Sequence, residues 1–349
     1  MNFCIRILSA AIMVALMSGS SALAQERADG NLTYLISPGN LPSPANHGAE
    51  NFTIRNRLGD GASWIVTADI LALRRVGGQA FSIEGIVLVG GEEIVNPLDE
   101  PGEELLNSRD FKFQNEFGPR VSLIRQGVFG HDIELNYFGI DGWKASKEVI
   151  NPNIRQEPGE SGFRFDYGSQ LHNVEINLRR PVTENMTLLA GFRWVEIHEN
   201  FDVTAFNFDG PEEEETLVLT LNTDNHLYGF QIGFDGTLYS HGGPLRIDCV
   251  LKAGIYGNSA DLTVIIPEPD LFWRNNRWHT AFIGEIGLIG VYQVNDHLAL
   301  RAGYQAMWVE GAALALDQLN DIYSEEEIGP YTGGSLFYHG AIAGLELRF

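Results

Sequence analysis

The last fourteen residues, 336–349, alternate apolar side chains with polar or small ones and end on an aromatic residue. One face carries Leu347, Leu345, Ala343 and Ala341, and the other carries Arg348, Glu346, Gly344, Ile342 and Gly340. A period of two is that of a β-strand. A strand with an apolar face at the end of a chain is typical of the closing strand of a transmembrane β-barrel, where lipid-facing and lumen-facing side chains alternate. The pattern indicates the solvent around the sheet and leaves the activity open.

The amino terminus predicts export. Arg6 precedes an apolar run over 7–17, and Ala22-Leu23-Ala24 has the small-residue pattern of a signal-peptide cleavage site. We therefore expect 1–24 to be a signal peptide, cleaved near Ala24. The run is too short to span a bilayer, and no later stretch has the roughly 18 apolar residues of a transmembrane helix.

Charge and cysteine content narrow the possible partners and cross-links. The formal net charge is -23, and removing the leader takes away one Arg and no acid, which gives -24. This balance argues against nucleic acid as a partner. Cys4 lies in the leader, so the mature chain keeps only Cys249 and cannot form an internal disulfide.

Ten segments of the mature chain alternate with period two. We expect strands near 64–74, 119–126, 131–139, 171–180, 187–197, 226–239, 245–256, 280–294, 298–309 and 336–349. Their connections alternate between short turns and long loops, the long ones near 75–118, 140–170, 198–225, 257–279 and 310–335. Outer-membrane barrels have short periplasmic turns, long external loops and an even strand count. The second segment is the weakest, because Arg125 shares a face with Val121 and Leu123.

Aromatic side chains fall near the expected ends of the strands. Trp194, Tyr228, Trp278 and Trp308 lie at the outer ends, and Trp64, Tyr239, Tyr292 and Phe349 lie at the periplasmic ends. Such girdles mark the two membrane interfaces of a barrel.

Several of these segments resemble a known family. They are Trp64 to Leu71, Leu189 to Trp194, Asn225 to Gly233, Arg301 to Ala306 and Tyr338 to Phe349. Together they resemble the outer-membrane β-barrel proteins found in planctomycete genomes, over roughly Trp64 to the end. The resemblance implies a fold and a location and carries no established activity.

The inward face of the expected barrel carries charges of both signs. The candidate lumen-lining residues are Asp69, Glu134, Glu175, Arg179, Arg193, Asp235, Arg246, Asp248, Lys252, Glu285, Arg301, Glu346 and Arg348. Buried charges must be paired, so one interpretation is a salt-bridged, closed interior with a structural role. The other is a narrow polar conduit for ions or small solutes, walled by the same residues. A barrel of about ten strands is too narrow for an open diffusion pore.

Two further interpretations stay open. The first is a secreted soluble β-protein for binding or adhesion. The second is a surface hydrolase that uses Glu196, His198 and Glu199 at the outer rim, with His172, His226 and Glu310 nearby. No paired-acid motif accompanies these residues, and the His residues are too scattered for a zinc signature. We therefore predict no enzyme activity, no catalytic residues, no cofactor and no specific metal site.

Acidic runs dominate the expected external loops, at 90–104, 209–215 and 324–327. We expect them to be solvated and to associate loosely with divalent cations. A shorter stretch, 312–319, could form a helix that acts as a lid or plug.

Taken together, these features predict an all-β, up-and-down antiparallel barrel of about ten strands, with eight or twelve as alternatives, over 64–349. The Pro- and Gly-containing segment 25–63 is expected to be a periplasmic tail. The expected location is the bacterial outer membrane. The expected partners are its lipid and the barrel-assembly machinery, which would be contacted through the strand ending in Phe349.

Overall fold

The computed structural model describes residues 63–77, 82–83, 106–107, 110–150, 160–208, 214–267, 270–319 and 329–349. The expected signal peptide, nearly all of the segment 25–63 and most of the acidic runs lie outside these residues. Among the described residues, no helix is long and apolar enough to cross a membrane.

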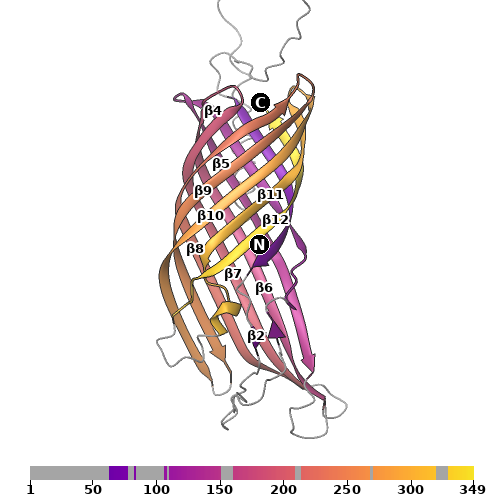
Figure 1. The fold of residues 1–349 in the computed structure, drawn as a ribbon, viewed down its shortest axis with the longest axis vertical. Helices are drawn as coiled ribbons and strands as arrows, with labels where there is room; N and C mark the ends of the chain where they lie inside the picture. Colours follow the sequence, from indigo (N-terminus) through magenta and orange to yellow (C-terminus); the bar gives the residue numbers. More distant parts are fainter. Residues whose placement is uncertain are drawn as a thin grey trace, which may run out of the picture. The chain divides into compact units, whose positions relative to one another are not determined.

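Ten strands form a closed barrel (Figure 1). They are β1 (Trp64–Gly77), β4 (Asn115–Val128), β5 (His131–Ile150), β6 (Glu160–Pro181), β7 (Met186–Phe208), β8 (Glu214–Ser240), β9 (Leu245–Ile266), β10 (Leu271–Asn295), β11 (Leu298–Ala312) and β12 (Gly334–Arg348). Each pairs antiparallel with the barrel strands next to it in sequence, and β1 and β12 close the ring. A two-stranded sheet of β2 (Ser82–Ile83) and β3 (Leu106–Asn107) is separate from the barrel sheet. The predicted fold class is confirmed.

The seam between β1 and β12 ends at the last residue of the chain. The Phe349 backbone N–H donates to the Trp64 carbonyl at 3.0 Å, and the Trp64 N–H donates to the Phe349 carbonyl at 3.1 Å. Register then runs from Ile65 opposite Arg348 to Gly77 opposite Leu336 without a bulge. No edge of the sheet is therefore left open along the seam, as a barrel in lipid requires.

The outward face of the strands carries large exposed apolar side chains. Phe230 is 77% exposed, Ile232 70% and Ile255 69%. These side chains form an apolar belt around the barrel. At the border of the belt that is farther from Phe349, Tyr228 contacts Trp278, and their ring centroids lie 5.7 Å apart. Water would disfavour so much exposed apolar surface on a continuous band, whereas hydrocarbon would not.

Arg125 lies at the end of this face where β1 begins, opposite Trp64. Its guanidinium stacks on the ring of Trp64, 4.7 Å from the centroid. A cation at the interface can keep its charge near water while its stem covers apolar surface. The strand that is weakest in the sequence is therefore present as β4, and its Arg125 belongs to the interfacial girdle.

The strands β5 to β10 extend along the barrel beyond their expected ends, on the side opposite the end at which β12 finishes. The segments expected to be long loops at 140–170, 198–225 and 257–279 are largely strand, and this part of the prediction was wrong. In β7 the pattern inverts beyond Trp194: Glu196 and His198 face outward, while Val195 and Ile197 are buried inward. Polar side chains thus replace apolar ones on the outward face beyond the apolar belt.

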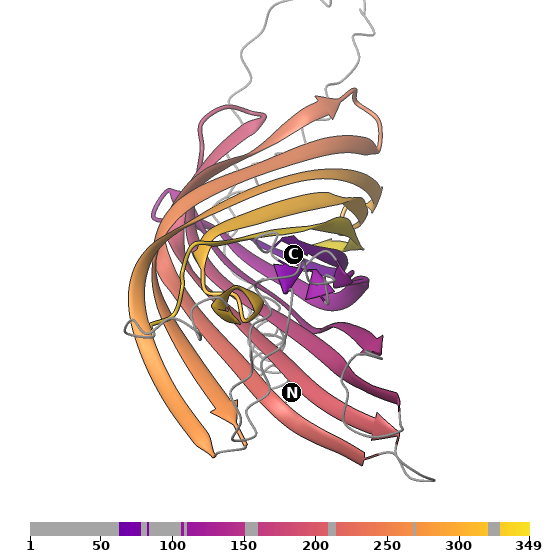
Figure 2. The ribbon, with the colours of Figure 1, turned by 60° about the horizontal axis from the view of Figure 1, so that its bottom comes forward.

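The stretch after β11 folds into the interior. Residues 312–319 are buried and contain a single 3-10 turn, η2 (Leu316–Gln318). Figure 2 shows this turn, in gold, within the curve of the extended strands. The expected short helix is present as this turn, and it lies as a plug inside the wall.

Candidate functional site

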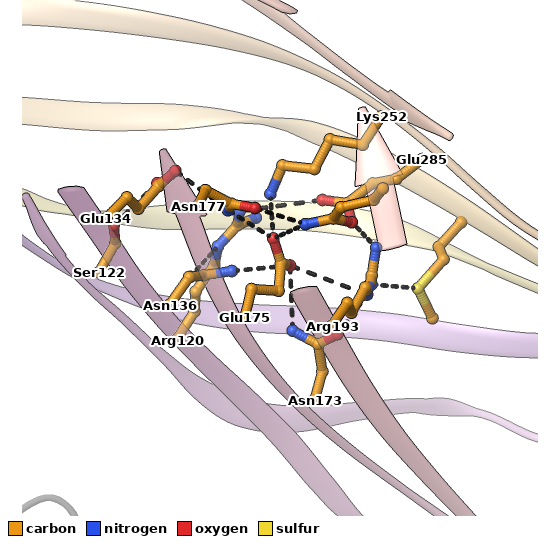
Figure 3. A network of polar contacts seen from close by, with 12 residues as sticks. Arg120, Ser122, Glu134, Asn136, Asn173, Glu175, Asn177, Arg193, Lys252 and Glu285 are labelled. Carbon is orange, nitrogen blue, oxygen red and sulfur yellow. Dashed lines mark hydrogen bonds and ion pairs between the residues drawn. The ribbon is translucent and has the colours of Figure 1, made fainter. Parts of the chain in front are cut away.

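Glu175 on β6 is the centre of a polar network in the middle of the barrel (Figure 3). Its carboxylate is fully buried and accepts hydrogen bonds from Gln231 at 2.8 Å and Lys252 at 2.8 Å. Asn136, Asn173 and Asn177 donate to the same carboxylate at 3.0–3.1 Å. A buried charge is stable only when it is paired and hydrogen-bonded, as this one is.

Arg193 on β7 extends the network towards the other wall. Its Nη1 donates to Glu285 Oε2 at 2.9 Å, its Nη2 to Met307 Sδ at 3.0 Å and its Nε to Asn173 Oδ1 at 2.5 Å. Arg120 on β4 donates to Gln305 Oε1 at 2.6 Å. All donors of this layer point into the bore.

These bonds cross the bore because they join strands that are not neighbours. Glu175 and Lys252 lie on β6 and β9, which β7 and β8 separate. Arg193 and Glu285 lie on β7 and β10, and Arg120 and Gln305 lie on β4 and β11. Side chains at hydrogen-bonding distance leave no room for water between them. We call this set of side chains the central seal: Arg120, Asn136, Asn173, Glu175, Asn177, Arg193, Gln231, Lys252, Glu285 and Gln305.

A second cluster of charges lies nearer the end of the barrel at which β12 finishes. Glu346 on β12 accepts from Arg348 at 2.6 Å, from Arg246 at 3.1 Å and from Arg301 at 3.2 Å. Arg301 also lies 3.4 Å from Asp69. One carboxylate thus ties together β9, β11 and β12.

This cluster lines a cavity of about 550 Å³. Its walls include Arg179, Asp235, Arg246, Glu346 and Arg348. The charged walls are already paired with one another, as in the contacts of Arg179 with Glu134 and Asp235. The cavity is therefore a polar vestibule beneath the central seal.

The outer half of the interior is apolar around a third ionic group. Arg75 on β1 pairs with Glu199 on β7 and donates to the Tyr167 hydroxyl at 2.9 Å. Tyr167 in turn donates to Glu199 at 2.5 Å, and the N–H of Ala315 in the plug donates to Glu199 at 3.1 Å. This carboxylate holds the plug against the wall.

Two asparagines secure the plug further. Asn225 both donates to the Ala313 carbonyl and accepts from its N–H, each at 2.7 Å. Asn258 donates to the Gly311 carbonyl at 3.0 Å and to Asn225 at 2.9 Å. Buried backbone groups of the plug are thereby satisfied by wall side chains, as burial requires.

All thirteen candidate lumen-lining residues lie on the inward face, and each has an ionic partner in that face. Glu134, Glu175, Arg193, Lys252 and Glu285 meet in or beside the central seal, whereas Asp69, Arg179, Asp235, Arg246, Asp248, Arg301, Glu346 and Arg348 gather around the vestibule. Sequence reasoning missed Arg120, Arg75 and the amides of the seal. The amides could not be found from the sequence, because neutral side chains carry no signal that distinguishes a seal from a water-lined wall.

The structure brings together only some of the residues of the hydrolase hypothesis: His226 Nδ1 lies 3.9 Å from Glu196 Oε1, and His172 is opposite Glu196 in the register of β6 and β7. Glu196, His198 and His226 face outward beyond the aromatic girdle, whereas Glu199 is buried on the opposite side of the wall. His198 Nδ1 lies 2.6 Å from Asp224 Oδ1, and this hydrogen bond raises the pKa of His198 against the opposing effect of partial burial. The same bond lowers the pKa of Asp224. Within the described ranges, no three His, Cys, Asp or Glu side chains are arranged to hold a metal ion.

Comparison with known proteins bears on the fold only. No protein-family model and no curated protein matches the sequence. The outer membrane protease OmpT from Escherichia coli is similar in structure at a TM-score of 0.48 and 10% identity, over 85% of this chain and 100% of that chain. The toluene transporters TodX of P. putida and TbuX of Ralstonia pickettii align at TM-scores of 0.31 and 0.32, each at 10% identity. They cover 83% and 85% of this chain, and 90% and 93% of theirs. These likenesses do not extend to a catalytic or transport mechanism.

Proposed function

We propose that this protein is an integral outer-membrane β-barrel with a closed bore, and that its role is structural rather than conductive. The observation that carries the proposal is the set of hydrogen bonds between non-adjacent strands in the central seal, above all Glu175 to Lys252 and Arg193 to Glu285. The charges of the seal are paired with one another: Glu175 with Lys252, and Glu285 with Arg193 and Arg120.

Placement in the outer membrane is supported by the exposed apolar belt and its aromatic borders. The lipid of that membrane is the proposed partner of the belt. The C-terminal strand, which ends in Phe349, is the proposed contact with the barrel-assembly machinery.

Single-channel recording in a planar bilayer tests the closed bore. Refolded wild-type protein should give no conductance steps. The variant Arg193→Ala/Glu285→Ala removes both partners of one ion pair across the bore, and it should give small steps. The variant also shows that the protein inserts under the conditions used. Steps from the wild type that match those of the variant would overturn the closed bore in favour of a conduit.

Absence of hydrolytic activity is also part of the proposal, because Glu199, the buried acid of the candidate set, is bonded to Arg75, Tyr167 and the plug, on the opposite side of the wall from His198. The test is the variant His198→Ala: a hydrolysis that is detected in purified protein and is lost in this variant would contradict it.

A further inference from the structure

A small group of polar side chains interrupts the outward apolar face where β1, β12 and β11 lie side by side. Arg74 on β1 is opposite His339 on β12 in the register. Both face outward, because Leu73 and Tyr338, which precede them, are buried in the interior. Tyr304 on β11 reaches the same place, since its hydroxyl lies 2.5 Å from His339 Nδ1. We call Arg74, His339 and Tyr304 the seam cluster.

Apolar side chains flank the seam cluster on both sides along the strands. On the side away from Phe349, Val76 is opposite Phe337, and both are exposed. On the side towards Phe349, Ala72 is opposite Phe117 on β4, which is 69% exposed. The cluster is therefore a polar site set into an outward apolar surface.

The seam cluster lies at the height where hydrocarbon gives way to lipid headgroups. The stretch of β1 from Trp64 to Arg74 spans about 33 Å of strand, which is about 25 Å of height at the usual tilt of roughly 35–45°. The apolar band of an outer-membrane barrel is also about 25 Å tall. Because Trp64 is bonded to Phe349, Arg74 lies at the border of the belt that is farther from Phe349.

The charge of Arg74 has no partner in the part of the chain that the structure describes. Its side chain is exposed and makes no ion pair or hydrogen bond with the described residues. The next residue, Arg75, faces inward and pairs with Glu199. A guanidinium carries five N–H donors in a fork that matches a phosphate or a carboxylate. At the border of a lipid belt, the anion that the surroundings supply is the phosphate of a headgroup.

His339 offers a second donor beside the guanidinium. A tyrosine hydroxyl that donates to Nδ1, as Tyr304 is placed to do, leaves the proton of a neutral imidazole on Nε2. Phe337 stacks on the His339 ring, with centroids 5.1 Å apart, and restricts its orientation. Paired residues on neighbouring antiparallel strands have Cα atoms about 4.5–5.5 Å apart. Two side chains at this spacing can donate to the oxygens of one phosphate.

We propose that the seam cluster is a binding site for the phosphate of a lipid headgroup, with the acyl chains lying on the apolar face towards Phe349. Arg74 would supply the charge and a forked pair of hydrogen bonds, and His339, positioned by Tyr304, would supply a further donor. The inference rests on the proposed membrane location and assigns one specific site on the lipid-facing surface. It is independent of whether the bore is closed.

Native mass spectrometry of the full mature chain in dodecyl maltoside tests the site with three probes. They are dioctanoyl phosphatidic acid, dioctanoylglycerol, which has the same chains and no phosphate, and inorganic phosphate. Wild-type protein should bind the phosphatidic acid at least about tenfold more tightly than dioctanoylglycerol, because hydrogen bonds to a charged group contribute about that factor. Inorganic phosphate should bind more weakly than the phosphatidic acid, because it has no acyl chains to bury.

Two substitutions that remove the same charge locate the phosphate. Arg74→Gln should lower the affinity for phosphatidic acid to that for dioctanoylglycerol, and should leave the affinity for dioctanoylglycerol unchanged. Lys144→Gln, at an exposed position further along β5, should bind all three probes as wild type does. The NMR signals of the His339 ring should shift when phosphatidic acid is added and stay in place with dioctanoylglycerol.

The outcomes separate this site from the membrane location on which it rests. Equal binding of the two lipids to wild type, or unchanged phosphatidic acid binding in Arg74→Gln, would overturn the phosphate site and leave the lipid-facing belt in place. Inorganic phosphate that binds as tightly as the phosphatidic acid would overturn the lipid assignment in favour of a free anion. Binding of neither lipid to well-folded wild type would count against the belt as well as the site.

Discussion

Lys252 on β9 donates a hydrogen bond of 2.8 Å to Glu175 on β6, across the middle of the barrel and past two intervening strands. Both side chains are almost completely buried, at 3% and 0% exposure. Removing one partner of such a pair leaves a buried charge without compensation.

The variant Glu175→Gln should therefore be strongly destabilised, by about 3–5 kcal/mol in free energy of unfolding. The matched change is Glu215→Gln, which breaks an ion pair of 2.7 Å between Glu215 and Arg164 on the exposed outer part of the wall. It should leave stability nearly unchanged, since water replaces the lost partner. Denaturant titration in detergent measures both. Equal effects of the two changes would contradict a buried role for Glu175.

The plug gives a second prediction. Asn225→Ala leaves the buried N–H and C=O of Ala313 without partners, at a cost of about 1–3 kcal/mol for each group. Hydrogen exchange at 311–319 should speed up, while the strands around it keep their protection. Asn222→Ala serves as the control, because Asn222 faces outward and bonds to Asn200 at 2.9 Å, away from the plug. The same acceleration in the control would rule out a specific latch.

The pair His198–Asp224 predicts a pH dependence outside the lipid belt. The hydrogen bond to the Asp224 carboxylate raises the folded pKa of His198 above its ordinary value of 6.5. A raised folded pKa contributes stability that is complete below 6.5 and is lost as pH rises through the folded value. Asp224, whose pKa is lowered, contributes only above its own unfolded pKa. The difference in free energy of unfolding between wild type and Asp224→Asn should thus be widest between the unfolded pKa of Asp224 and that of His198. It should close in alkaline solution.

An NMR titration of the His198 ring checks the same pair directly. Its midpoint should lie above 6.5 in wild type and should fall towards that value in Asp224→Asn. A midpoint that the substitution leaves unmoved would mean that the pair contributes no electrostatic coupling.

Two changes at Phe349 distinguish the role of its backbone in the seam from a role of its ring in assembly. Deleting the residue removes both terminal hydrogen bonds to Trp64, whereas Phe349→Ala keeps them and removes only the ring. Refolding in detergent should be impaired by the deletion and little affected by Phe349→Ala. If the assembly machinery binds the ring, Phe349→Ala should lower the folded fraction in cells. Normal assembly of Phe349→Ala in cells would remove that proposed partner.

The facing of side chains within each strand could be predicted from the sequence, whereas contacts across the bore could not. Alternation in β12 separated Leu345 from Glu346 correctly, because one face meets lipid and the other meets the interior. It also placed Glu175 and Lys252 on the inward face, although nothing in either strand indicates that they meet. Contacts across the bore depend on strand tilt and register, which no single segment encodes.

The outer halves of the strands were missed for a different reason. Beyond Trp194 the outward face becomes polar and the inward face apolar, so the pattern keeps its period and reverses its sense. A search for apolar side chains on the outward face alone ends at the girdle. Val203 and Phe201, buried inward, carried the signal that the strand continues.

Accessibility of spin labels in lipid vesicles tests most directly whether hydrocarbon surrounds the apolar belt. Single cysteines replace Phe230, Ile232 or Asn222 in a Cys249→Ser background, and each carries a nitroxide. Labels at 230 and 232 should collide often with oxygen, which concentrates in hydrocarbon, and rarely with a water-soluble nickel chelate; the label at 222 should show the reverse. Free access of the chelate to positions 230 and 232 in well-folded protein would contradict a lipid-facing belt and, with it, the membrane barrel.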